Sequence, residues 1–240
     1  MLAGIKTDLQ KAVKKGVSAY DIEDLACKLI KKTGGEASFK KVPGYNWATC
    51  VNVNDQVVHG IPKKTRIFKK GDVVSVDVGL FYKGFHTDTS FSVGVDAADD
   101  VNRFVKAGER AVAKAIKQCL AGNYVYDLSK AMESVIVGEG YSPVTSLVGH
   151  GVGKNLHEEP QIPCFTYGKR EETPQLQEGL VLAIEVMYGQ GSGEVVKEDD
   201  GWTISTADGK ISGLVEETVA IEADGPFVLT TTNHSATESD

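Results

Sequence analysis

The feature that most constrains the fold of this chain is an internal repeat with an offset of about one hundred residues. Residues 16–22 read Gly-x-x-x-Tyr-Asp-Ile, and residues 122–128 read Gly-x-x-x-Tyr-Asp-Leu. Farther along, each copy has an apolar strand that ends in an acid six residues after a glycine, Asp77 in the first copy and Glu185 in the second. The common order predicts two equivalent units, each with a helix or two and several strands.

A third paired motif, His-x-x-Pro, lies between the helix and the strand of each copy and begins at His59 and at His157. We expect one domain over residues 1–240, made of two pseudo-symmetric halves, roughly 1–95 and 98–225, that face each other across a cleft. Equivalent positions converge on the axis of such an arrangement. The duplicated acids and histidines should therefore meet between the halves.

Local signals place a helix at the start of each copy. Ser18 and Asp21 form a capping box ahead of an apolar periodicity, which predicts a helix over residues 19–32 that ends at Gly34. The second copy continues with the same periodicity over residues 128–135.

Composition and charge exclude several classes of protein. The net charge of -7 argues against a general nucleic-acid binder, although the basic segment 63–71 leaves docking on ribosomal RNA open.

Four cysteines without a Cys-x-x-Cys pair indicate reduced thiols in a cytosol. No apolar run approaches the roughly 18 residues of a membrane helix, and the chain starts with an amphipathic helix that lacks a signal-peptide core. We therefore expect a cytoplasmic protein with no membrane or specific nucleic-acid partner, and a short polar tail at 231–240.

The segment 149–160, GHGVGKNLHEEP, places two of the five histidines seven residues apart in a run of alternating glycines. Glycine lets the backbone approach a ligand closely, so His150 and His157 are candidate site residues. The glycine spacing fits neither a Walker A phosphate loop nor a dinucleotide-binding motif. A tight connecting loop with two incidental histidines is the alternative that this segment alone leaves open.

Carboxylates occur inside strand-like apolar runs. Asp77 and Asp88 flank the turn at residues 82–84, so a hairpin should place them on adjacent strands, where its register can bring them side by side. Near the C-terminus, strand alternation directs one of Glu216 and Glu217 inward.

The inward candidates are Asp77, Asp88, Glu185 and Glu216. Burial of each as an unpaired ion would cost several kcal/mol, which divalent cations would offset. With His150 these acids form a hard, oxygen-rich set without thiolate, suited to Mn, Fe or Co more than to structural zinc, and five ligands favour a pair of ions. Any one acid alone is better explained as a strand-edge or turn carboxylate, but together they indicate a metal centre.

Five sequence blocks resemble the type I methionine aminopeptidases, which are metallopeptidases of the pita-bread fold. The blocks occur in the family's order, and they are VNVNDQVVHGIP (51–62), GDVVSVDVG with GFHTDTS (71–90), LVGHGVGKNLHEEPQIP (147–163), EGLVLAIEVM (178–187) and GWTISTADGKISGLVEETV with DGPFVLT (201–230). The resemblance implies an α+β pita-bread (creatinase/aminopeptidase) fold with a central antiparallel sheet flanked by helices. It also implies a metal-dependent exopeptidase, a hydrolase that removes the N-terminal methionine from nascent proteins and peptides.

The resemblance also assigns roles to residues. Two divalent metal ions per chain (Co, Mn, Fe(II) or Zn) would be held by Asp77, Asp88, His150, Glu185 and Glu216. Asp88 and Glu216 would bridge the two ions, His150 and Glu185 would complete one site, and Asp77 would chelate the other ion. Glu185 would also accept a proton as a metal-bridging hydroxide forms and attacks the first peptide bond.

Two histidines match substrate-contacting positions of the family. His157 would stabilise the developing oxyanion, and His59 would form a hydrogen bond near the scissile nitrogen. Cys50, Trp202 and Tyr45 match positions that line the methionine pocket, where a thioether meets sulfur and aromatic surface.

Two positions depart from the family pattern. Val186 stands where the family often has proline, and Glu217 replaces a common histidine in a Val-Glu-Glu-Thr sequence that also resembles prolidases. An X-Pro peptidase on the same fold is therefore the alternative enzyme, and a non-catalytic pita-bread binding module is the alternative outside enzymes. The partners implied are nascent N-termini that begin with methionine, with a transient ribosome contact left open, and the chain is expected to be a monomer.

Overall fold

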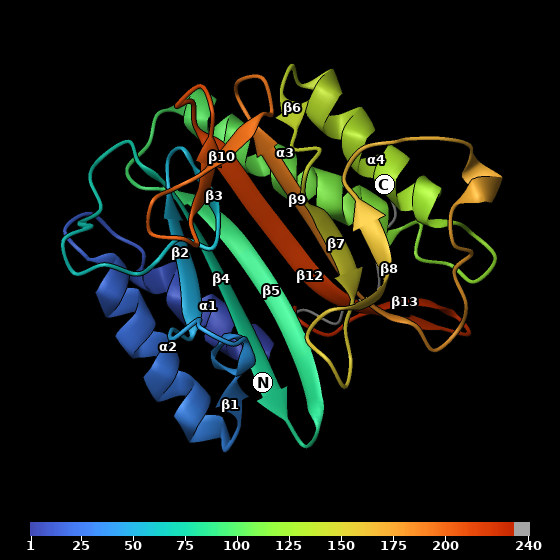
Figure 1. The fold of residues 1–240 in the computed structure, drawn as a ribbon, viewed down its shortest axis with the longest axis horizontal. Coiled ribbons are helices and arrows are strands. Elements are labelled where there is room, and N and C mark those ends of the chain that lie inside the picture. The colour runs from blue at the N-terminus through green and yellow to red at the C-terminus, as the bar shows by residue number, and fades with distance from the viewer. Residues whose placement is uncertain (233–240) are drawn as a thin grey trace.

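The computed structural model describes residues 1–232, and Figure 1 shows a broad antiparallel sheet with the helices behind it. The helices are α1 (Leu2–Ala12), α2 (Ala19–Thr33), α3 (Asp99–Ile116) and α4 (Val125–Gly138), with 3-10 turns η1 (Phe39–Lys41) and η2 (Arg170–Glu172). The strands of the main sheet are β1 (Glu36–Ala37), β2 (Thr49–Val53), β4 (Val73–Tyr82), β5 (Phe85–Gly94), β6 (Ser142–Pro143), β7 (Val148–Gly151), β8 (Glu158–Pro163), β9 (Val181–Gly189), β12 (Ser212–Glu222) and β13 (Gly225–Val228). A second sheet consists of β3 (Gln56–Val58), β10 (Val195–Lys197) and β11 (Ile204–Thr206).

The order of the strands places the two copies of the repeat next to each other. The main sheet runs β1-β4-β5-β12-β9-β7-β8, so β4 and β5 of the first copy adjoin β12 and β9 of the second. Helices α1 and α2 cover the first pair of strands, and α3 and α4 cover the second pair (Figure 1). The junction between β5 and β12 is therefore the seam of the fold, although the division into halves at 1–95 and 98–225 remains our proposal.

The two copies also begin in the same way. Gly16 and Gly122 adopt positive φ angles of 87° and 93°, a region that glycine enters without a steric penalty. The N–H of Gly16 donates to the carbonyl of Phe68 at 2.9 Å, and that of Gly122 donates to the carbonyl of Leu176 at 2.9 Å. Each helix is thereby joined to the segment that precedes the strand of its own copy.

The predicted helix at 19–32 is confirmed as α2. The Ser18–Asp21 capping box is formed, and the left-handed Gly34 follows the last helical residue. In the second copy Asp127 accepts the backbone N–H of Tyr124 at 2.8 Å, at the same place in α4.

Alternation along the central strands separates a helix-covered face from an open face. The side chains of β4 in the core with α1 and α2 are those of Val74, Val76, Val78 and Leu80. The side chains of β9 in the core with α3 and α4 are those of Leu182, Ile184, Val186 and Tyr188. Asp77 and Glu185 lie between these positions, so both point to the open face. The sequence predicts that each strand ends at its acid, but β4 continues to Tyr82 and β9 to Gly189. The strands are longer because the apolar alternation continues beyond the acids.

Among residues 1–232, no helix has the length and apolar character needed to cross a membrane. The basic segment 63–71 is a surface loop in which Phe68 is buried. Of the predicted tail at 231–240, all but the first two residues lie outside the described part of the chain.

Candidate metal centre and substrate cleft

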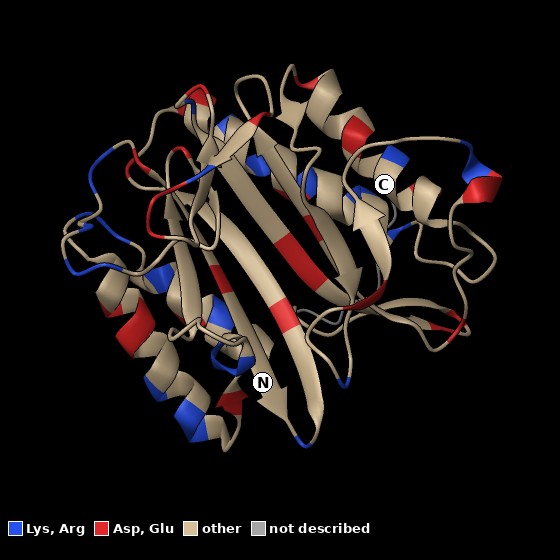
Figure 2. Cartoon of the chain, viewed as in Figure 1, with Lys and Arg blue, Asp and Glu red and all other residues tan. Residues whose placement is uncertain are grey.

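Four carboxylates from the four central strands meet on the open face of the sheet. They are Asp77 on β4, Asp88 on β5, Glu216 on β12 and Glu185 on β9. In Figure 2 acidic segments of the central strands lie next to one another across the sheet. Glu216 is opposite Glu185 on one side and opposite Ser90 on the other.

The hairpin of β4 and β5 sets the positions of the first two acids. Lys83 and Gly84 form its turn with positive φ angles of 49° and 89°, as a two-residue primed turn requires. This register places Asp88 opposite Gly79 and two positions away from the partner of Asp77. Asp77 and Asp88 are thus diagonal neighbours on adjacent strands rather than directly side by side.

The pair Glu216–Glu217 is divided between the two faces of β12. Glu216 is only 3% exposed and lines the cleft on the open face. Glu217 points to the helices and forms an ion pair with Lys6 of α1 at 2.6 Å. The expectation that one of the two acids is directed inward is confirmed.

A compact set of possible metal ligands lies at the seam. Asp88, His150 and Glu216 are all buried, and each offers a ligand atom within 4.8 Å of the others. Asp77 and Glu185 line the same cleft beside them. The structure therefore brings together all five predicted ligands, whose individual roles remain predictions.

Burial dominates the electrostatics of the acids. It raises the pKa of Glu185 to about 8 and the pKa of Asp88 to about 7, and the charge of Asp88 adds to the shift at Glu185. The pKa values of Asp77 and Glu216 are also raised, first by burial and then by the neighbouring carboxylates. A cation that binds here must displace protons from these groups.

His150 is prepared to act as a ligand. Its Nδ1 lies 2.9 Å from the carbonyl oxygen of Gly151, and a carbonyl can only accept, so Nδ1 carries the proton. Nε2 is left with a free lone pair. Burial lowers the pKa of His150 to about 4, so the ring is neutral at physiological pH, as metal binding requires.

The residues fit a divalent metal. Asp77 Oδ1 is buried and has no hydrogen-bond partner, although unpaired buried carboxylate oxygens are costly. The donor set of four carboxylates and one imidazole suits hard divalent cations. A cation would satisfy the unpaired oxygen and compensate the clustered charge.

A cavity of about 200 Å³ opens beside this cluster. It is lined by every site residue predicted from the sequence: Tyr45, Cys50, His59, Asp77, Asp88, His150, His157, Glu185, Trp202 and Glu216. The residues that the sequence patterns and the family resemblance indicated are therefore gathered at one place by the fold.

Two further histidines face the cavity as neutral rings. Burial lowers the pKa of both His59 and His157. His157 packs edge-on against the ring of His150, with centroids 4.5 Å apart. His59 has a φ angle of 58°, uncommon for a residue with a side chain, and such backbone conformations concentrate at functional sites.

One wall of the cavity is aromatic and sulfur-bearing. The ring of Tyr45 lies 5.0 Å from that of Trp202, and the Tyr45 hydroxyl is 3.2 Å from Cys50 Sγ. The same hydroxyl donates to the carbonyl of Thr49 at 2.9 Å, which fixes the ring. Burial raises the pKa of the Cys50 thiol, so it contributes a neutral, polarisable surface.

Sequence reasoning missed the apolar residues that complete this wall. They are Phe39, Val42, Val58 and Leu156. Leu156 precedes His157 in the glycine-rich motif and could have been chosen from that position. Phe39 lies in the short turn η1, where no motif marks it.

Comparison with known families and proteins gives consistent matches. The family described as Metallopeptidase family M24 matches residues 3–223. A methionine aminopeptidase from Clostridium perfringens is 38% identical over 223 residues, which cover 92% of this chain and 88% of the relative. Methionine aminopeptidase 1 from Bacillus subtilis is 38% identical over 224 residues, with coverage of 93% and 89%.

Solved structures agree with these matches. The methionine aminopeptidase of Thermotoga maritima superposes with a TM-score of 0.91 at 37% identity, and the match covers 96% of this chain and 92% of that one. The prolidase of Pyrococcus furiosus reaches a TM-score of 0.75 at 21% identity and is covered over 60% of its length, so the likeness concerns the fold alone. The predicted α+β pita-bread fold is confirmed.

Proposed function

The chain belongs to metallopeptidase family M24, and we propose that it acts as a methionine aminopeptidase on peptides and nascent proteins. The observation that carries this proposal is the joining of a buried acid cluster to a small aromatic and sulfur-lined cavity. The similarity to methionine aminopeptidases over more than nine-tenths of the chain supports the same activity.

The proposed metal centre contains two divalent ions, bound by Asp77, Asp88, His150, Glu185 and Glu216. Asp88 and Glu216, which stand on either side of the seam between β5 and β12, would help to hold both ions. When bound, a pair of divalent ions lowers the pKa of coordinated water and polarises a carbonyl group.

The remaining steps fall to the side chains of this chain. Glu185 is proposed to take the proton of the attacking water on a carboxylate oxygen and to pass it to the leaving amine. His157 would donate a hydrogen bond to the oxygen of the scissile carbonyl as negative charge develops there. His59 would form a hydrogen bond near the scissile nitrogen and orient the bond.

We propose that the side-chain pocket recognises the methionine side chain of the substrate. An unbranched thioether fits a narrow cavity, and its sulfur makes favourable contacts with aromatic rings. We assign the recognition of methionine to Tyr45, Cys50 and Trp202. The half-buried Trp202 forms the outer edge of this wall.

We also propose a cytoplasmic monomer. All four cysteines are free, which supports a reducing compartment. If the chain contacts the ribosome transiently at nascent N-termini, the basic loop at 63–71 is the surface whose charge suits RNA.

The experiment that tests the function is hydrolysis of Met-Ala-Ser and of an X-Pro dipeptide by metal-stripped protein supplied with Mn(II), Fe(II), Co(II) or Zn(II). Glu185→Gln removes the proton acceptor at constant shape, and Glu36→Gln on β1 is the matched exposed control. We expect metal-dependent release of methionine, lowered about 10²-fold or more by Glu185→Gln and unchanged by the control. Preferential cleavage of X-Pro would replace this function with that of a prolidase-like peptidase. Metal binding without hydrolysis of either substrate would instead favour a binding module.

A further inference from the structure

Strands β5 and β12, which carry the proposed bridging acids, are joined mainly through side-chain hydroxyls. Within the described residues they share one register pair, Glu216 with Ser90. The hydroxyl of Thr218 donates to the carbonyl of Asp88 at 2.6 Å and accepts its N–H at 2.9 Å. The hydroxyl of Thr89 donates to the carbonyl of Glu216 at 2.8 Å. The spacing of the two acids therefore depends on these hydroxyl contacts.

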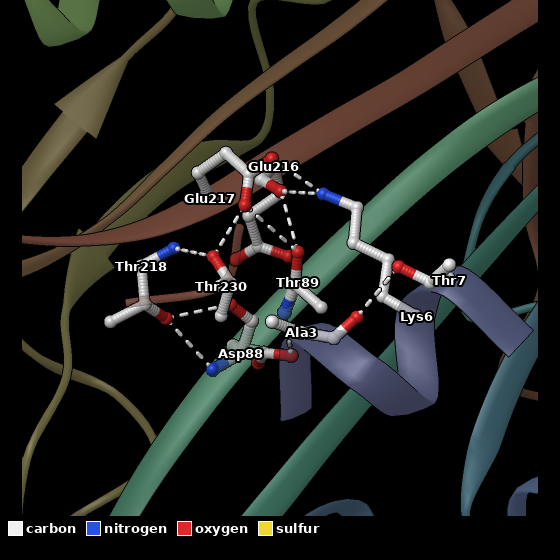
Figure 3. Close-up of polar contacts among 9 residues, drawn as sticks. All are labelled: Ala3, Lys6, Thr7, Asp88, Thr89, Glu216, Glu217, Thr218 and Thr230. Atoms are coloured by element: carbon white, nitrogen blue, oxygen red, sulfur yellow. Dashed lines mark hydrogen bonds and ion pairs between the residues drawn. The ribbon is translucent and has the colours of Figure 1, made fainter. Parts of the chain in front are cut away.

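A buried ion pair stands behind this junction on the helix-covered face. Lys6 of α1 lies 2.6 Å from Glu217 Oε1, and its Nζ also lies 3.4 Å from the carbonyl oxygen of Glu216 (Figure 3). The side chains of Lys6 and Glu217 are only 10% and 19% exposed. The pair lines a separate cavity of about 290 Å³ between α1, α3 and the sheet.

The ion pair is continuous with the hydroxyl contacts. Glu217 Oε2 accepts a hydrogen bond from the hydroxyl of Thr230, and that hydroxyl accepts the backbone N–H of Thr218 at 2.9 Å (Figure 3). One branch thus runs from Lys6 through Glu217, Thr230 and Thr218 to the backbone of Asp88. The other branch runs from Lys6 directly to the backbone of Glu216.

Stability alone gives a poor account of such a pair. The attraction between two buried charges offsets little more than the free energy lost when they leave water. Apolar residues of the same volume often stabilise a fold to the same extent. Here the charges are connected to the backbone of two acids that must be set at a fixed separation. Contacts that orient ligands without touching the metal commonly alter affinity and activity by about 10- to 100-fold.

We propose that Lys6 and Glu217 are positioning residues, which hold the carboxylates of Asp88 and Glu216 at the separation that metal binding needs. The inference rests on the proposed function, in which both acids contact the ions. It gives α1, which contributes no residue to the cleft, a part in forming the metal centre from the opposite side of the sheet.

The test uses Lys6→Met, which keeps the aliphatic stem, Glu217→Gln, which is isosteric, and the double variant. Arg170→Met is the control, because it removes an ion pair of 2.7 Å with Asp127 on α4, and neither residue lines the cleft. Three quantities are measured: the affinity of metal-stripped protein for Mn(II) by calorimetry, kcat and KM for Met-Ala-Ser, and the unfolding midpoint without metal.

We expect each single variant to lower Mn(II) affinity and kcat by about tenfold with little change in KM. The double variant should recover the unfolding midpoint, since no unpaired buried charge remains, while Mn(II) affinity stays low. Recovery of both quantities in the double variant would reduce the pair to a structural role and overturn the proposal. So would single variants with lowered midpoints and unaltered Mn(II) affinity.

A milder pair of variants covers the case in which the charge variants fail to fold. Thr230→Val removes the linking hydroxyl at constant shape, and Thr230→Ser keeps it. Lower Mn(II) affinity in the valine variant alone supports the proposal, and equal affinity in the two contradicts it. The affinity for Mn(II) is measured without substrate, so this comparison does not depend on peptidase activity. If the wild-type protein binds Mn(II) but cleaves neither peptide, the proposed function is overturned. The comparison of the two Thr230 variants still tests the positioning role in that case.

Discussion

Glu185 and Glu216 lie directly opposite each other on neighbouring antiparallel strands, and both side chains face the open side of the sheet. Like charges at opposed positions destabilise a sheet. Their carboxyl groups are buried, which raises the pKa of each above its ordinary value. A sheet built in this way gains stability from a cation, and that dependence can be measured.

Removal of metal is expected to lower the midpoint of thermal unfolding. A cation present at about 100 times its Kd adds about 2.7 kcal/mol to the free energy of unfolding when it binds only the native state. Differential scanning calorimetry with and without Mn(II) measures the shift. Asp77→Asn should lose part of it, whereas Asp24→Asn, an exposed acid of α2, should behave like the wild type. Equal midpoints with and without metal in the wild type would count against the metal centre.

Substitution of His157 by Ala should act on the chemical step. The neutral ring faces the cleft, and removal of one oxyanion donor lowers kcat by about 10²- to 10³-fold in other hydrolases. KM should change little. His86→Ala is the control, because this buried histidine forms a hydrogen bond with Ser38 and does not line the cleft. A change confined to KM would assign His157 to ground-state binding instead.

The two tryptophans offer a matched test of the side-chain pocket. Trp202 lines the cleft, whereas Trp47 packs edge-on against the same Tyr45 ring, with centroids 5.3 Å apart, and does not line the cleft. Trp202→Ala should raise KM for Met-Ala-Ser about tenfold, which corresponds to about 1.4 kcal/mol of lost binding. Steady-state kinetics of Trp202→Ala beside Trp47→Ala measures the difference. The assignment fails if both variants alter KM equally.

Asp127 should contribute to stability only above acidic pH. Its hydrogen bond from Arg170 holds its pKa below the ordinary value. The unfolded carboxyl titrates near pH 3.9, so the contribution is complete at neutral pH and is lost as the pH falls below about 4, through the folded pKa. Urea unfolding should show Asp127→Asn about 1 kcal/mol less stable than wild type at pH 7. The difference should shrink at pH 3; a constant difference would exclude this linkage.

Much of the site was predictable because local rules fix it. Strand alternation alone indicates that Glu216 and Glu217 point to opposite faces, and the structure agrees. The capping box at Ser18 and the turn at Lys83-Gly84 are equally local, and both occur where the sequence places them. The repeat extends such local predictions across the chain, because it identifies acids that the fold brings to one seam.

Other features depend on tertiary packing and leave no local trace. The diagonal placement of Asp77 and Asp88 follows from the register of the hairpin, which spacing alone did not determine. The position of Phe39 in the wall of the cavity depends on how η1 packs over the sheet. The ion pair of Lys6 with Glu217 joins positions 211 residues apart, at opposite ends of the repeat.

The seam between β5 and β12 also determines when the site can exist. Asp88 and Thr218, which hydrogen-bond across it, are 130 residues apart in the chain. Contacts of such long range form late in folding, because the entropy of closing the loop must be lost before they are made. During synthesis the acids of β4 and β5 emerge first, and the set of ligands stays incomplete until β12 has emerged and docked. A newly made copy of this protein therefore gains its metal centre only after β12, the last of the ligand-bearing strands, has been translated.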